Sequence, residues 1–219
     1  MVSVQLRDHV VEVFRCDLEK IPYFKALFSS NLQDSEADTH KLDLTADHFR
    51  TAMTFAVEGK PRKLLSGLPR TTNVTELAAA LDFLCIDIPT LPYTQLAANL
   101  KDVHYEYDKY GTSHQPNRNR ARDAAAVLVF GLNTGRLDFD DANKGYNLVL
   151  FVLSHSKTFG PHIRYHAFAV AMETIPLTNK QLAELRSWHP ETALDGVESE
   201  DDSGCSDDGI LGWESDDSD

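Results

Sequence analysis

Nine histidines are the most obvious candidates in this chain for metal binding or acid–base chemistry. His162 and His166 stand four residues apart, a spacing that places two imidazoles on one face of a helix, as a metal site needs. However, residues 163–172 alternate loosely between apolar and polar, which predicts a strand, and there residues four apart lie about 13 Å from each other. No further Cys, His or acid stands at a companion spacing. We therefore expect neither a metal nor a cofactor.

Nucleophilic chemistry has little support. Ser154, His155 and Ser156 are consecutive, and neighbours on a strand point to opposite faces. The chain contains neither a Gly-x-Ser-x-Gly turn nor a glycine-rich phosphate loop. Cys85 is expected to be a small buried hydrophobe, and Cys205 lies among acids that disfavour its thiolate. One alternative stays open, namely a small α+β enzyme with a site in residues 118–189 that uses His155, His162 or His166.

Two basic stretches, residues 60–63 with Arg70 and the arginines at 118, 120 and 122, could contact phosphates. The charge balance argues for solvated loops instead. Of the formal net charge of −13, the last 29 residues contribute −12, because they hold twelve acids and no Lys or Arg, while residues 1–190 carry only −1. We therefore do not expect nucleic acid as a partner.

The acidic segment 190–219 cannot bury enough apolar surface to offset the entropy of ordering it, so we predict a disordered tail. Its one compact apolar group is Ile210, Leu211 and Trp213, which we interpret as a docking peptide with Trp213 as the anchor. Ser199 precedes three acids and suits an acid-directed kinase. A plain solvated tail is the alternative.

The remaining sequence is typical of a globular protein without a membrane partner. Its 219 residues include no apolar run of about 18, the length that crosses a bilayer. Residues 1–14 lack the cationic start and apolar stretch of a secretory signal. We expect the protein in the cytoplasm, the nucleus or both.

The elements that would position any site begin with an alternating hairpin over residues 2–14. A helix with Pro22 at its first position follows, then a strand at 42–44 and a helix over 49–57 that ends at Gly59. Asn73 and Glu76 have capping-box spacing and start a helix through 77–85, and a shorter helix covers 93–100. These elements predict an α+β domain over residues 1–100.

The second half is separated by a predicted linker at 101–117. Residues 124–132 and 148–153 are continuous apolar runs, which we assign to a helix and a strand, and 163–172 gives a further strand. Thr178 and Gln181 form a second capping box that starts a last helix to Trp188. Residues 118–189 are thus expected to be a smaller α+β domain.

Over residues 2–100 the order of elements resembles a BTB/POZ domain, in the short form of the potassium-channel tetramerisation type. The matching segments are the hairpin 2–14, LEKIPYFKALFSS at 18–30, LDLTADHF at 42–49 and ELAAALDFLCI at 76–86. The resemblance implies a non-enzymatic adaptor that forms homo-oligomers and docks onto a cullin-type ubiquitin ligase scaffold. It implies partner contacts at Phe28, Ser29, Ser30, Leu32, His48 and Arg50. Residues 101–190 resemble no known family, and we expect them to bind a second, unidentified protein.

Overall fold

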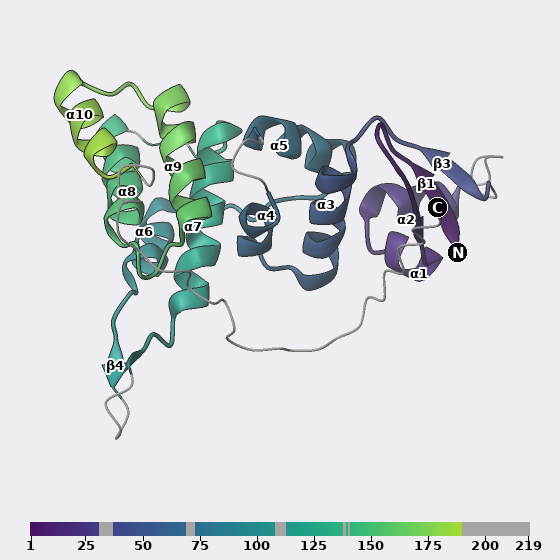
Figure 1. The fold of residues 1–219 in the computed structure, drawn as a ribbon, viewed down its shortest axis with the longest axis horizontal. Coiled ribbons are helices and arrows are strands. Elements are labelled where there is room, and N and C mark those ends of the chain that lie inside the picture. The colour runs from purple at the N-terminus through teal and green to yellow at the C-terminus, as the bar shows by residue number, and fades with distance from the viewer. Residues whose placement is uncertain (31–36, 69–72, 108–112, 138, 140, 190–219) are drawn as a thin grey trace, which may run out of the picture.

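The computed structural model describes residues 1–30, 37–68, 73–107, 113–137, 139 and 141–189. The fold is α+β, with a small sheet at one end and helices over the rest of the molecule (Figure 1). The predicted tail at 190–219, including Ser199, Ile210, Leu211 and Trp213, lies outside the described residues, as do Leu32 and Arg70.

The sheet has three strands in the order β2-β1-β3, namely β1 (Val2–Gln5), β2 (Val10–Val13) and β3 (Thr39–Lys41). β1 pairs antiparallel with β2 and parallel with β3. The predicted hairpin is confirmed, and its alternation buries Val2, Val4, Val11 and Val13. The third strand was expected at 42–44 but ends at Lys41, because the chain turns away there and the carbonyl of Leu44 accepts from the Arg7 amide at 2.9 Å.

The described residues of the first half also form six helices. They are α1 (Arg15–Leu18), α2 (Pro22–Ser29), α3 (Ala46–Glu58), α4 (Arg62–Ser66), α5 (Val74–Phe83) and α6 (Tyr93–Lys101). Thr45 caps α3, and Gly59 ends it with a φ of +64° that glycine adopts without strain. Asn73 caps α5 as predicted, through the Thr75 amide at 2.8 Å. The short helix α4 was missed, because Pro61 and Gly67 suggested a loop.

The second half is helical in its described part, so the two strands predicted there are wrong. After a small hairpin of β4 (Glu106–Tyr107) and β5 (Ser113–His114) come α7 (Arg118–Asn133), α8 (Ala142–Ser154), α9 (Pro161–Thr174) and α10 (Asn179–Ser187). α8 covers the segment assigned to the strand 148–153, and α9 covers 163–172. The α+β assignment of residues 118–189 is corrected to α. The capping box at Thr178 and Gln181 is confirmed.

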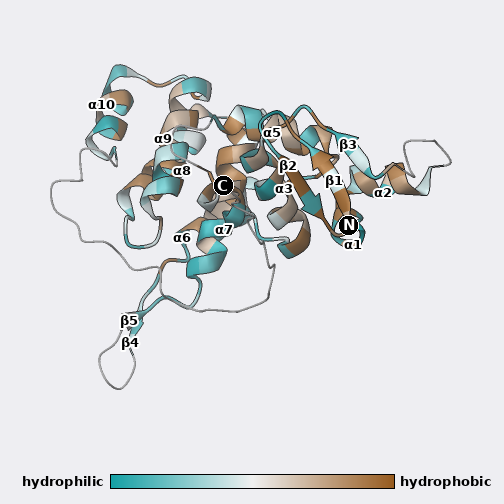
Figure 2. Ribbon diagram, turned by 45° about the vertical axis from the view of Figure 1, so that its right-hand side comes forward, coloured by the Kyte–Doolittle hydropathy of each residue, from teal (hydrophilic) through white to brown (hydrophobic). Residues whose placement is uncertain are grey.

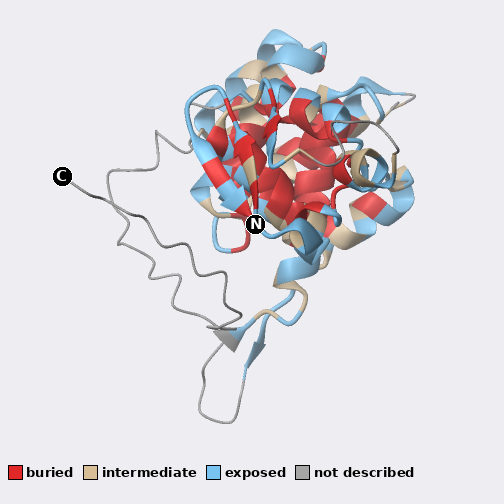
Figure 3. Cartoon of the chain, turned by 90° about the vertical axis from the view of Figure 1, so that its right-hand side faces the viewer, coloured by how far each residue is buried: buried red, intermediate tan, exposed pale blue. Residues whose placement is uncertain are grey.

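One hydrophobic core joins both halves. The buried residues form a single cluster that extends from Val2 in β1 to Leu185 in α10. α7 lies at its centre: every residue from Ala124 to Leu132 is buried, and the helix packs against α4, α5, α6 and α9. Figure 3 shows these buried segments running through the interior. Residues 118–189 therefore share their core with the first half.

Candidate docking surfaces

The end of α2 holds the first three residues expected to contact a partner. Phe28 is half-buried: its ring lies 5.8 Å from that of Phe24 and 5.4 Å from that of His40, and the Arg15 guanidinium lies 4.3 Å from its centroid. Ser29 and Ser30 donate hydrogen bonds to carbonyls of their own helix. Phe28 therefore belongs to the edge of the core, with Arg15 over one face, and is not a free anchor.

Two further residues predicted to contact a partner, His48 and Arg50, lie on α3. His48 is only 5% exposed, so its expected role in partner contact is wrong for this conformation. The reason is its position: it stands next to Phe49 in the first turn of a helix whose inner face is buried. Arg50 is exposed, as expected, and its Nη1 lies 3.9 Å from Asp47 Oδ1. The structure thus keeps Arg50 and Ser29 as accessible members of the set.

The outer face of the sheet carries an exposed apolar group that the sequence prediction missed. Met1 is 70% exposed, Val10 62% and Phe14 58%. The register Val2↔Val13 places Met1 next to Phe14, on the face opposite the buried valines. β2 is also an edge strand in the described sheet, and Figure 2 shows hydrophobic residues along β1 and β2. The sequence signal was Val10, an apolar residue out of phase with the buried positions Val11 and Val13.

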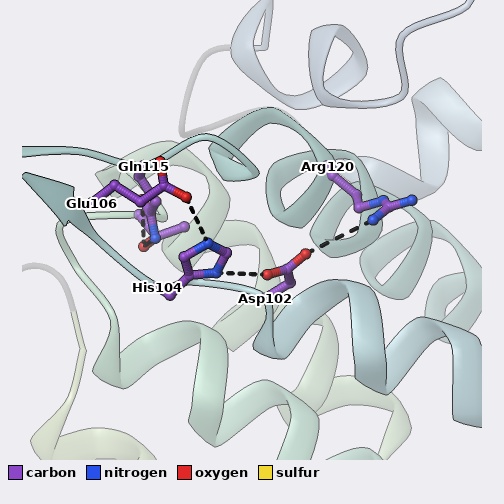
Figure 4. Close-up of polar contacts among 6 residues, drawn as sticks. Asp102, His104, Glu106, Gln115 and Arg120 are labelled. Atoms are coloured by element: carbon purple, nitrogen blue, oxygen red, sulfur yellow. Dashed lines mark hydrogen bonds and ion pairs between the residues drawn. The ribbon is translucent and has the colours of Figure 1, made fainter.

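A chain of alternating carboxylates and imidazoles leads from the end of α6 onto the β4–β5 hairpin, and Figure 4 shows its members Asp102, His104 and Glu106. Asp102 Oδ1 lies 2.9 Å from His104 Nδ1, and His104 Nε2 lies 3.5 Å from Glu106 Oε1. Glu106 Oε2 lies 3.3 Å from Nε2 of its cross-strand partner His114, and Arg120 Nη1 lies 3.8 Å from Asp102 Oδ2. A carboxylate on Nδ1 can orient an imidazole as a base, but here Nε2 faces a second carboxylate. The network connects the hairpin to α6 and α7.

The three histidines of the enzyme alternative have different surroundings. His155 stacks on Phe151 at 3.9 Å, and its Nδ1 lies 2.8 Å from the Phe151 carbonyl and 3.1 Å from Ser154 Oγ. His162 and His166 share a face of α9, contrary to the strand-based expectation. His166 is buried, and its Nε2 has no hydrogen-bond partner in the described part of the chain. Among the described residues no three His, Cys, Asp or Glu side chains are arranged to hold a metal.

Three arginines of the two basic stretches form ion pairs or hydrogen bonds with other parts of the same chain. Arg62 forms a 2.7 Å ion pair with Asp123. Arg118 and Arg122 donate to the carbonyls of Lys157 and Thr158 at 3.2 and 2.7 Å. These arginines hold α7 against α4 and the loop before α9.

Two hollows on the surface complete the description. One, lined by residues of α7 and the chain before α6, has a volume of about 10 Å³, room for about one water. The other is an open groove of about 280 Å³ between α3 and α4, lined by polar side chains. No sequence motif indicated this groove, because α4 itself was not predicted.

Comparison with protein-family models, with curated proteins and with solved structures gave no match to this chain. None of the described helices is long and apolar enough to span a bilayer.

Proposed function

We propose that this protein is a non-enzymatic adaptor of the cytoplasm or nucleus that self-associates through the outer face of its sheet. The observation that carries this proposal is the exposure of Met1, Val10 and Phe14 on and beside β2, which is an edge strand of the sheet in the described residues. Exposed apolar groups of this kind on a soluble domain are typical of interaction sites. An edge strand adds backbone donors and acceptors that a second strand can pair with.

The arrangement of the first half supports a BTB-like module. Its order of a hairpin, a helix, a third strand parallel to the first and a following helix agrees with the resemblance over residues 2–100. We extend the proposal to a cullin-type scaffold that contacts the exposed positions Ser29 and Arg50, with the helical second half available to a further protein partner.

Self-association is tested by light scattering on the full chain at tens of micromolar. We expect a mass above the 24.5 kDa of one chain, and Phe14→Asp should return the monomer. Tyr107→Asp is the matched control, because Tyr107 is similarly exposed but lies on β4, far from the sheet (Figure 1). A wild-type monomer, or equal effects of both variants, overturns the proposed surface.

Scaffold docking is tested by co-purification of a cullin with the full chain. Phe28→Asp would disturb the aromatic group around Phe24, so the variant of choice is Arg50→Glu, combined with Ser29→Glu. We expect this pair to abolish recovery of the cullin while the circular dichroism spectrum is unchanged. Lys60→Glu, an exposed change outside the set, is the control. Unchanged recovery contradicts docking at this surface.

The acidic tail enters the proposal as a separate docking peptide. Trp213→Ala in the full chain should remove one co-purified partner without changing the oligomeric state. Ser199→Ala should abolish labelling by an acid-directed kinase. If Trp213→Ala leaves the set of co-purified partners unchanged and Ser199→Ala leaves the kinase labelling unchanged, the tail has no docking role.

A further inference from the structure

The groove between α3 and α4 is lined by two polar stripes. Asp47, Arg50, Thr51 and Thr54 follow one another at helical spacing on α3, while Lys63, Ser66 and Gly67 do so on and directly after α4. The opposite side of α3 is apolar and faces the core. Two neighbouring helices thus turn hydroxyls, the two cations Arg50 and Lys63 and the one carboxylate of Asp47, rather than apolar groups, toward a shared opening of about 280 Å³.

Of the hydroxyl donors in this groove, only Ser66 has a hydrogen bond within the described residues, to the Lys63 carbonyl at 3.5 Å. The hydroxyls of Thr51 and Thr54 have no hydrogen-bond partner among the described residues, although Thr51 is buried. Lys63 contacts no carboxylate within 4.0 Å in the same residues. Arg50 has only the 3.9 Å contact with Asp47. The Thr51 hydroxyl is not among the buried unpaired atoms of the described residues, so it is reached from the groove and can donate to a ligand there.

Gly67 keeps the Thr51 hydroxyl accessible. A Cβ at Gly67 would lie 3.1 Å from Thr51 Oγ1, tighter than ordinary van der Waals contact. The backbone of Gly67 has a φ of −85°, which any residue adopts, so the conformation does not require glycine there. Glycine at position 67 therefore leaves room in the groove beside the Thr51 hydroxyl, which a side chain at this position would fill.

We propose that this groove binds a phosphorylated serine or threonine in a peptide segment of a partner protein. Cations stand on opposite walls, Arg50 on α3 and Lys63 on α4, with hydroxyl donors between them. A phosphate group presents three acceptor oxygens around a tetrahedron and can accept from both walls at once, whereas a planar carboxylate has only two. The groove is separate from the outer sheet face, so its test does not depend on self-association. It shares Arg50 with the surface proposed for the scaffold, so the variants below leave Arg50 unchanged.

The test is a titration of the full chain, labelled for NMR, with three short synthetic peptides that differ at one position. The central residue is phosphoserine, serine or glutamate. We expect the phosphopeptide alone to shift the amide signals of Thr51, Thr54 and Gly67, with an affinity that falls as salt rises. Inorganic phosphate should shift the same signals more weakly. Equal binding of the serine or glutamate peptide, or no shift in the groove, overturns the proposal.

Two variants locate the contact. Lys63→Gln removes a charge-assisted hydrogen bond and should weaken phosphopeptide binding about tenfold or more. Gly67→Ala should weaken binding by narrowing the groove while the fold is retained. Lys60→Gln is the matched control, because Lys60 forms an ion pair with Glu58 at 3.1 Å and does not line the groove. Loss of binding in the control to the same extent would show general charge attraction and contradict the site.

Discussion

Asp123 in α7 binds Arg62 twice, once through the side chain and once through the backbone. Its Oδ2 lies 2.7 Å from the Arg62 guanidinium, and its Oδ1 accepts from the Arg62 amide at 2.9 Å. The amide is the first of α4, which has no capping side chain of its own. A carboxylate from the second half therefore caps a helix of the first half and fixes one wall of the α3–α4 groove.

Replacing Asp123 should destabilise the whole chain. Asp123→Ala leaves a helix-terminal amide and a half-buried guanidinium without their acceptor, and we expect a loss of about 2 kcal/mol in the free energy of unfolding. Asp123→Asn keeps the acceptor for the amide and should lose less. Urea denaturation measures both. Asp43→Ala, which breaks the exposed pair with Arg7, should change stability little. An Asp123→Ala variant as stable as wild type would contradict this capping role.

The fold of the first half could be predicted because its signals are local. Pro22 at a helix start, Asn73 as a cap and Gly59 at a helix end each act within one turn, and the hairpin alternates with period two. The residues proposed to contact a partner were harder to predict from the sequence. Whether His48 or Arg50 faces solvent depends on which side of α3 meets the core, and that is fixed by long-range packing.

The second half was assigned wrongly where the outer positions of a helix are also apolar. Leu148, Val149, Val152 and Leu153 are buried at helical spacing in α8, but the half-exposed Leu150 and Phe151 between them are apolar too, so the run has no polar face to distinguish helix from strand. In α9 the buried positions 163, 164, 166, 167, 170 and 171 have helical spacing, but two of them are the polar residues Arg164 and His166. Counting both as polar, and therefore exposed, produced the apparent alternation.

Cys85 lies two residues beyond Phe83, the last residue of α5, and is exposed, contrary to the expectation that it is buried. Its φ is +57°, and the Ile86 amide donates to the Leu81 carbonyl at 2.8 Å, as in a Schellman motif. Because a side chain disfavours this backbone region, Cys85→Gly should raise the free energy of unfolding by about 1 kcal/mol. Cys85→Ala retains the Cβ and should give no gain. Equal stability of the glycine and alanine variants in urea would contradict strain at this position.

His166 should make the protein acid-sensitive. Burial, together with the nearby His162, lowers the pKa of His166 from 6.5 to about 4. Between these two values the unfolded chain binds a proton that the folded chain does not. This contribution to stability is therefore fully present above pH 6.5 and is lost as the pH falls toward 4, by up to about 1.4 kcal/mol per pH unit. NMR titration of the imidazole should show a neutral ring at pH 5, and His166→Phe should reduce the acid sensitivity. An imidazole that titrates near 6.5 would contradict the prediction.

Arg164 joins the ends of two helices and should be the arginine most costly to replace. It is buried in α9, and it donates to the Leu153 carbonyl at the end of α8 at 2.9 Å and to the Trp188 carbonyl after α10 at 3.1 Å. Helix C-termini carry partial negative charge, which favours a cation there.

Arg164→Met leaves both carbonyls without this donor, and we expect a loss of about 3 kcal/mol in the free energy of unfolding. Arg186→Met, an exposed change on α10, should cost much less. Trp188 fluorescence in a Trp213→Phe background reports the change directly, because the chain has only these two tryptophans. Equal denaturation midpoints for the two arginine variants would show that Arg164 does not hold α10 in place.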